Sequence, residues 1–191
     1  MMNADLRQQA VKFEKARNNL LLVIIFTTVN LFLITVDAGI YFLFSATIPQ
    51  LIVQIGKEVI LETGSNIVFI ICTIIAAVIV ILYVVFWLLA KNIRVFILIA
   101  LIYFSFDSLL LLYLILIQEF EFSFLLEIAF HVWILFCLIS GTKAWANLRS
   151  VSSDDFKQLL QEIKQINAGL EPAAKPQQDE PETTEEEPTQ P

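Results

Sequence analysis

Residues 93–117 read IRVFILIALIYFSFDSLLLLYLILI, an almost unbroken apolar run. At about 1.5 Å per residue, a helix of this length spans roughly 37 Å, which exceeds the bilayer hydrocarbon core of about 30 Å. The stretch therefore predicts a transmembrane helix that carries one carboxylate, Asp107, inside the membrane. The surrounding apolar residues outweigh the cost of about 3 kcal/mol for a central Asp, so the helix is expected to insert whether or not the carboxylate has a partner.

Three further apolar runs are long enough to cross a membrane, at residues 19–44, 67–90 and 122–141. A hydrophobic content of 58% is too high for a soluble domain of 191 residues. We expect an all-α fold, a four-helix transmembrane bundle over residues 19–146. The first apolar run is longer than the 7–15 residues typical of a signal peptide, which favours a retained anchor.

The basic residues are distributed unevenly between the two sides of the predicted bundle. Lys57 is the only one of the 12 Lys and Arg residues in a loop on the outer side. Since cytoplasmic loops retain positive charge, both termini are predicted to be cytoplasmic, and the chain is predicted to be a multi-pass protein of the cell (plasma) membrane. The basic residues assigned to the cytoplasmic side are Arg7, Lys12, Lys15, Arg17, Lys91, Arg94, Lys143, Arg149, Lys157, Lys164 and Lys175.

An amphipathic helix is predicted between the first two spans, at about residues 48–61. Thr47 and Gln50 form a capping-box pattern, and Pro49 sits in the first turn. Apolar residues recur at helical spacing and polar residues fall largely on the opposite face. We expect this external helix either to lie on the outer membrane interface or to cap the bundle.

The cytoplasmic segments differ in character. Residues 1–18 form a basic N-terminus, and residues 152–168 predict a short amphipathic helix that begins with serines and acids. Its apolar stripe could dock on the membrane, on its own bundle or on a neighbouring subunit. Residues 171–191 hold seven acids and one lysine, which accounts for most of the net charge of −7, and this tail is expected to be disordered. The residues of the apolar stripe are Phe156, Leu159, Leu160, Ile163 and Ile166.

A polar cluster is predicted around Asp107. If a tight turn near residue 120 joins two antiparallel spans, Asp107 lies level with about Trp133, within one turn of His131, the only histidine. Glu127 lies four residues before His131 on the same helical face, and Tyr103 lies one turn from Asp107. Three polar residues on the first two spans are expected at similar depth and are possible contributors: Asn30, Cys72 and Thr73.

Several interpretations of this cluster remain open. The groups can be interhelical hydrogen-bond partners, worth about 0.6–2 kcal/mol each, that fix helix register. They can form a proton or ion relay, because intramembrane ionisable groups often mark such pathways. A metal site on Asp107, Glu127 and His131 is disfavoured because zinc usually requires more His or Cys. Glu127 can also face water, leaving Asp107 alone in the bundle.

Enzymatic chemistry is not indicated by any motif. The chain has no Walker loop, GxSxG, HExxH or CxxC pattern and no basic surface for nucleic acid, so we expect no catalytic residue, metal or cofactor. Cys72 and Cys137 are interpreted as unpaired. The leading hypothesis is a non-enzymatic interaction or accessory subunit in the lipid bilayer, binding a second copy or another membrane protein through the 152–168 helix. The alternative is a proton-coupled transporter or channel that uses Asp107 and His131. A membrane enzyme comes third, because Asp107, Glu127 and His131 could do acid–base chemistry but no nucleophile is evident beside them.

Three segments also carry a resemblance: KARNNLLLVIIFTTVNLFL at 15–33, YFLFSATIP at 41–49 and AFHVWILFCLISGTKA at 129–144. Together they resemble a group of uncharacterised small four-span integral membrane proteins of Gram-positive bacteria, over roughly residues 13–146. The resemblance implies a bacterial cell-membrane location and a four-helix form. It implies no activity and no functional residue.

Overall fold

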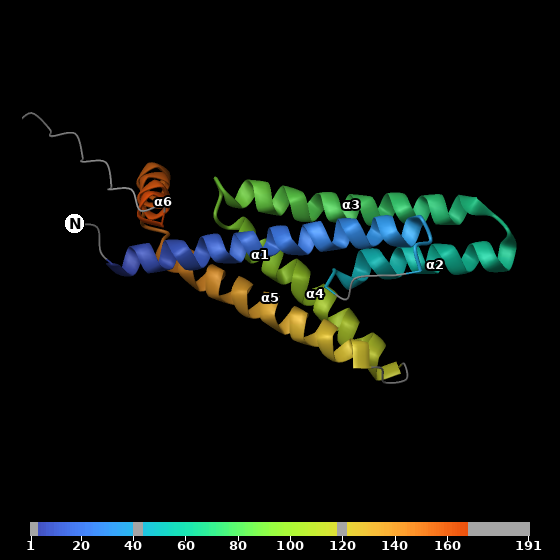
Figure 1. The fold of residues 1–191 in the computed structure, drawn as a ribbon. Helices are drawn as coiled ribbons and strands as arrows, with labels where there is room; N and C mark the ends of the chain where they lie inside the picture. Colours follow the sequence, from blue (N-terminus) through green and yellow to red (C-terminus); the bar gives the residue numbers. More distant parts are fainter. Residues whose placement is uncertain (1–3, 40–43, 118–121, 168–191) are drawn as a thin grey trace, which may run out of the picture.

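The computed structural model describes residues 4–39, 44–117 and 122–167, and within these ranges the chain is helical with no strand. Helix α1 lies at the centre of the arrangement and contacts each of the other five (Figure 1). The six helices are α1 (Ala4–Thr35), α2 (Thr47–Thr63), α3 (Asn66–Ala90), α4 (Phe96–Ile117), α5 (Phe122–Asn147) and α6 (Ser153–Asn167).

Four of these helices, α1, α3, α4 and α5, are long and apolar enough to cross a membrane. This confirms the all-α class, and these four helices lie where the four spans were predicted. Helix α1 differs from the predicted 19–44 span, since it begins at Ala4 and ends at Thr35. It ends there because Asp37 and Gly39 adopt left-handed φ angles of 56° and 67°. The Lys57 ammonium group then donates a hydrogen bond to the Ile34 carbonyl at 3.2 Å.

Helices α1 and α5 approach closely at a pair of small residues. A Cβ atom built on Gly141 would lie 2.3 Å from the Ala16 Cβ, so only glycine fits at this position without a shift. The core continues along both helices through fully buried side chains such as Leu20, Ile134 and Leu138. This contact fixes the depth of α5 relative to α1.

Helix α2 has nearly the predicted bounds, but it runs along the spans rather than across their end. It turns at Gly64, which has a left-handed φ of 67°, and packs antiparallel to α3 (Figure 1). The two helices approach closely at Gly56, where an added Cβ atom would lie only 2.9 Å from the Cys72 Cβ. The structure thus differs from a helix lying on the interface, because Val53 on the apolar face of α2 is buried against Ile34 of α1 and Ala76 of α3.

Helix α6 crosses the bundle at the end that also holds the start of α1 (Figure 1). The Ser152 hydroxyl accepts a hydrogen bond from the Asp155 N–H and so caps the helix start. Phe156 packs edge-on against Phe13, with ring centroids 5.7 Å apart. Of the three docking surfaces left open by the sequence, the structure has α6 on its own bundle. The predicted tail, 171–191, and the side chain of Ile166 lie outside the described residues.

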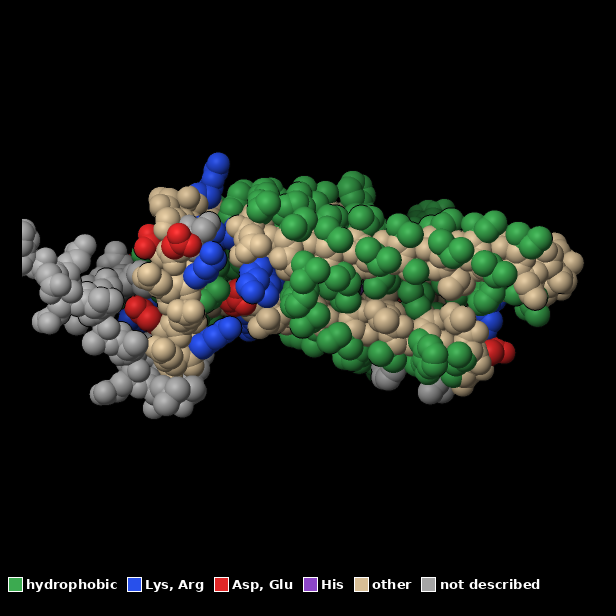
Figure 2. All heavy atoms as spheres, turned by 90° about the horizontal axis from the view of Figure 1, so that it is seen from above, with side chains coloured by type: hydrophobic (Ala, Val, Ile, Leu, Met, Phe, Trp, Pro, Cys, Tyr) green, Lys and Arg blue, Asp and Glu red, His purple; other side chains and the backbone are tan. Residues whose placement is uncertain are grey.

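The outer surface divides into an apolar body and a basic end. Figure 2 shows hydrophobic side chains along the bundle and most of the visible Lys and Arg side chains where α6 meets it. Helix α3 is the least buried span: only 17% of its most apolar stretch is buried within the molecule. We call the end at α6 the basic end.

Candidate functional site: a helix start inside the bundle

The first turn of α2 lies inside the bundle. The Asn30 amide donates hydrogen bonds of 2.9 Å to the Ser45 hydroxyl and to the Gln50 carbonyl oxygen. Helix α1 continues for five residues beyond Asn30, yet residues 45 and 50 lie beside Asn30. The chain therefore returns into the bundle after α1 ends, and α2 begins there.

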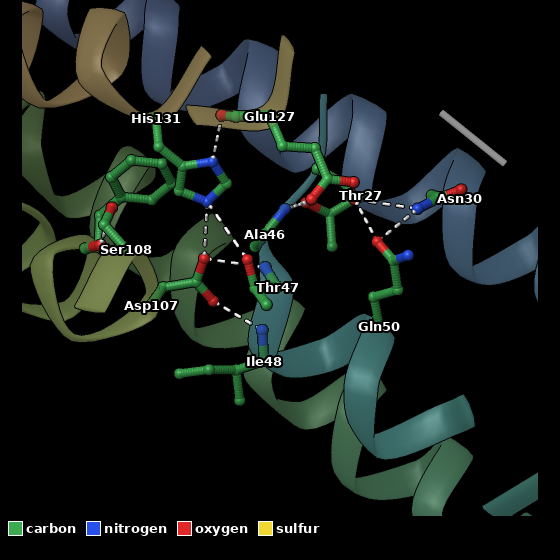
Figure 3. Close-up of polar contacts among 12 residues, drawn as sticks. Thr27, Asn30, Ala46, Thr47, Ile48, Gln50, Asp107, Ser108, Glu127 and His131 are labelled. Atoms are coloured by element: carbon green, nitrogen blue, oxygen red, sulfur yellow. Dashed lines mark hydrogen bonds and ion pairs between the residues drawn. The ribbon is translucent and has the colours of Figure 1, made fainter. Parts of the chain in front are cut away.

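A helix start carries backbone N–H groups that have no acceptor within the helix, and burial makes them costly. The N-cap residue is Ala46, whose side chain cannot accept a hydrogen bond. Other helices supply the acceptors (Figure 3). The Ala46 N–H donates to the Thr27 hydroxyl on α1 at 2.9 Å. The N–H groups of Thr47 and Ile48 donate to the two carboxylate oxygens of Asp107 on α4, at 2.8 and 2.7 Å.

The capping box predicted for Thr47 and Gln50 is not formed. Thr47 lies within the first helical turn, one residue after the N-cap, and no side chain of the segment itself caps the helix. The Gln50 carbonyl oxygen accepts instead from Asn30 and from the Ser45 hydroxyl, the latter at 2.9 Å. Asp107 takes over the capping role because its carboxylate offers two acceptors to two adjacent donors.

His131 on α5 is the second partner of Asp107. The ring Nε2 lies 3.2 Å from Asp107 Oδ2, and the ring Nδ1 lies 2.9 Å from the Glu127 backbone carbonyl. Phe104 stacks on the imidazole with centroids 5.1 Å apart and an angle of 13° between the planes. Asp107 is 0% exposed and His131 is 3% exposed. The imidazole is thus held in place by a hydrogen bond along its own helix and by a ring of α4.

The partners of His131 fix one of its ring hydrogens. The Glu127 carbonyl can only accept, so Nδ1 carries a hydrogen and donates. Nε2 faces two groups, Asp107 Oδ2 and the Thr47 hydroxyl.

The Thr47 hydroxyl lies 3.4 Å from His131 Nε2, which puts a hydroxyl, an imidazole and a carboxylate close together. In a catalytic triad the hydroxyl lies at one ring nitrogen and the carboxylate at the other, where it orients the ring and stabilises the imidazolium that forms. Here both lie at Nε2, and Nδ1 is bonded to a backbone carbonyl. The arrangement therefore differs from that of a catalytic triad.

The other predicted members of the cluster contribute differently. Glu127 provides its backbone carbonyl, and its half-buried side chain points away from the imidazole (Figure 3). Tyr103 packs edge-on against Tyr83 on α3, with centroids 5.0 Å apart. Thr73 donates to the carbonyl of its own helix at Phe69, and Cys72 packs against Gly56. Asn30 belongs to the adjoining network with Ser45 and Gln50.

Three side chains and three N–H groups at this site were not predicted from sequence: Thr27, Ser45 and Gln50, with the donors of residues 46–48. The sequence contains one indication that this helix start needs acceptors from elsewhere, namely the alanine before Thr47. An alanine at the N-cap of a helix that follows an apolar run leaves donors without a local acceptor, which indicates an acceptor elsewhere in the fold.

Within the described ranges, no three His, Cys, Asp or Glu side chains gather closely enough to hold a metal ion. In the same ranges the buried hydroxyl of Tyr83 has no hydrogen-bond partner. No protein-family model, curated protein or solved structure matches the chain, so neither activity nor site residues are carried over from a known protein.

Proposed function

We propose that the chain is a non-enzymatic, multi-pass membrane protein that works by helix association in the bilayer, either with a second copy or as an accessory subunit of another membrane protein. The observation that carries this proposal is the outward face of α3. Seven branched apolar residues lie along this face, and the distance in sequence from each to the next alternates between four and three residues. This α3 ridge consists of Ile67, Ile71, Ile74, Val78, Ile81, Val85 and Leu88, which are 36–67% exposed.

A spacing of 3.5 residues keeps a stripe facing one partner along the whole length of a left-handed helix pair. Helices in a membrane associate through close packing, because lipid tails are as apolar as the side chains. Ile and Val have one dominant rotamer in a helix, so they lose little side-chain entropy on packing. The α3 ridge therefore suits packing against an equivalent ridge of a second copy.

The buried polar site supports a non-enzymatic reading. Both carboxylate oxygens of Asp107 accept backbone N–H groups of α2, and the His131 ring is fixed on both sides. These groups hold the start of α2 in the bundle, and the Thr47 hydroxyl beside them is not arranged as in a catalytic triad. Helix α6 offers less to a partner than the sequence suggested, because Phe156 and Leu159 are already buried within the molecule.

The orientation proposed for the chain has both termini in the cytoplasm of a cell, with the basic end facing inward. The start of α1 and helix α6 lie at the same end of the bundle (Figure 1), which supports this assignment. Lys91 and Arg94, between α3 and α4, also lie there, and Lys57 lies at the far end of the bundle, where it pairs with Asp37. Loops on the cytoplasmic side of membrane proteins generally carry an excess of Lys and Arg.

Cysteine cross-linking in native membranes tests the proposal. In a chain with Cys72→Ser and Cys137→Ser, one cysteine is placed at Ile74 on the α3 ridge and, in a control, at Leu109 on α4. The two sites are matched in exposure, at 59% and 61%. Oxidation is expected to give disulfide-linked dimers from position 74 and monomers from position 109. An accessory subunit gives instead an adduct from position 74 with another protein when a bifunctional reagent is used.

Monomers from both positions, with no second protein enriched after purification in mild detergent, would contradict the proposal. Equal dimer yields from both positions would also count against it, because random collision in the membrane cross-links any two exposed sites.

One observation favours a second candidate, a proton relay. The Asp107 carboxyl and the His131 imidazole lie 3.2 Å apart within two of the apolar helices, and titratable groups at such depth often belong to transport pathways. Proton flux into liposomes under a membrane potential separates the two functions. The relay predicts flux in the wild type that is lost in Asp107→Asn and His131→Ala at matched incorporation. Under the leading proposal, wild-type liposomes are as tight as empty ones.

A further inference from the structure

A small cleft opens at the basic end, between the α3–α4 turn and α6. Its volume is about 160 Å³, and it is lined by Lys91, Asn92, Arg94, Phe156 and Lys157. Three of its five lining residues are cationic. The lining comes from two segments more than 60 residues apart in sequence, which α6 brings together by packing on the bundle.

Arg94 provides a fixed positive charge at this cleft. Its guanidinium donates to the carbonyls of Leu148 and Val151, at 2.6 and 2.7 Å, and lies 4.7 Å from the centre of the Phe156 ring. Burial lowers the pKa of Arg94 from its ordinary value, but a guanidinium stays protonated in proteins. In the part of the chain that the structure describes, no carboxylate pairs with it. Its charge is therefore uncompensated although it is partly desolvated.

The two lysines add mobile charge to the rim of the cleft. Lys91 is exposed and has no ion pair among the described residues. Lys157 is exposed as well and lies 3.3 Å from Asp154, whose side chain is 89% exposed. The lining thus holds three cations and no acid, and the one recorded ion pair is with a largely solvated carboxylate, so the cleft attracts anions.

The position of the cleft indicates where an anion would come from. The α3 ridge ends at Leu88, which is 53% exposed, and Lys91 follows within one turn. Trp87, an aromatic of the kind that anchors helices at the headgroup level, lies under the Arg17 guanidinium at 5.3 Å. Figure 2 shows the basic side chains where the apolar surface stops. The cleft therefore lies at the boundary between the hydrocarbon core and the aqueous phase.

We propose that this cleft binds the phosphate group of an anionic phospholipid. Phosphate oxygens are strong acceptors for the Lys91 and Lys157 ammonium groups and for the Asn92 amide, and Arg94 supplies the charge beneath them. The acyl chains of such a lipid would lie along α3, beside the exposed apolar side chains below the cleft. Inorganic phosphate offers the same oxygens but lacks the acyl chains.

Native mass spectrometry of the full chain in a neutral detergent tests this site. The probes are a short-chain phosphatidylglycerol, a phosphatidylcholine with the same chains, and inorganic phosphate. The variant Lys91→Gln/Lys157→Gln removes both rim charges, and Lys143→Gln is the control, because Lys143 is exposed on α5 and does not line the cleft. Arg94 is left intact because it holds the end of α5.

The wild type and the control are expected to bind phosphatidylglycerol more tightly than phosphatidylcholine. The double variant is expected to lose about thirtyfold in affinity for phosphatidylglycerol, which corresponds to about 1 kcal/mol for each lysine. Equal affinities of the double variant and the wild type, with unchanged melting temperatures, would overturn the site. Displacement of the lipid by inorganic phosphate at equal concentration would overturn the lipid as the ligand.

Discussion

The substitution Asp107→Asn tests how firmly the start of α2 is held. The wild-type carboxylate accepts the N–H groups of Thr47 and Ile48 and faces His131 Nε2. An asparagine keeps one acceptor oxygen, for one of the two N–H groups, and its amide nitrogen faces the other donor. One buried N–H loses its partner at a cost of about 1–3 kcal/mol, and the remaining bond is no longer charge-assisted, which adds about 1 kcal/mol. We expect a loss of about 3 kcal/mol in the free energy of unfolding.

Asp107→Ala removes both acceptors and leaves His131 without its partner, so we expect a larger loss, of about 5 kcal/mol. Ser108→Ala is the matched control. Ser108 is the next residue on α4, and its hydroxyl donates only to the Phe104 carbonyl of its own helix, so its loss should change stability by less than about 0.5 kcal/mol. The assay is reversible unfolding by sodium dodecyl sulfate in mixed micelles, followed by circular dichroism. An Asp107→Asn chain as stable as the Ser108→Ala chain would refute the capping role.

Three further predictions concern other parts of the molecule. Gly141→Ala should lower the free energy of unfolding by about 1–3 kcal/mol through overpacking, and Ala16→Gly in the same chain should restore most of it; no rescue would mean that the two sites do not touch. Phe156→Ala should release α6, detected as faster proteolysis of residues 153–167 while the spans stay protected, and unchanged protection of α6 would contradict its docking. Lys57 lowers the pKa of Asp37 below the ordinary value of 3.8, so this pair stabilises the fold above pH 3.8 and the stabilisation is lost as the pH falls through the lowered pKa. Asp37→Asn should remove that pH-dependent part of an acid titration, and an identical titration in the variant would argue against the pair.

Hydropathy located the spans well because the length of an apolar run is itself the property that the membrane selects. The predicted 67–90 span became Asn66–Ala90, and 93–117 became Phe96–Ile117. The first span was misjudged at its end. Residues 40–44 continue the apolar run, but Asp37 and Gly39 end the helix before it. A hydropathy pattern contains no information about left-handed backbone angles, so the first span was predicted to continue beyond the actual end of the helix.

The meeting of Asp107 and His131 was anticipated from depth, since two antiparallel helices joined by a short turn fix which residues are level. Depth leaves the rotation of each helix open, and rotation decided the roles of the other polar residues. Tyr103 turns toward α3, and Glu127 contributes a carbonyl instead of its carboxyl. The third partner, the start of α2, lay outside this reasoning because an amphipathic helix between two spans was expected at the interface or as a cap on the end of the bundle.

The central structural claim is that the chain returns into the bundle and that α2 begins there. Labelling of single cysteines with a membrane-impermeant maleimide tests it most directly, in a chain with Cys72→Ser and Cys137→Ser. Leu61→Cys, at a site 87% exposed, should react rapidly. Ser45→Cys, at a site 5% exposed, should react at least about a hundredfold more slowly, since access requires a local opening of about 3 kcal/mol. Asp107→Ala should speed the reaction at position 45. Equal rates at positions 45 and 61 in the chain with Asp107 intact would place the start of α2 at the surface and contradict the account.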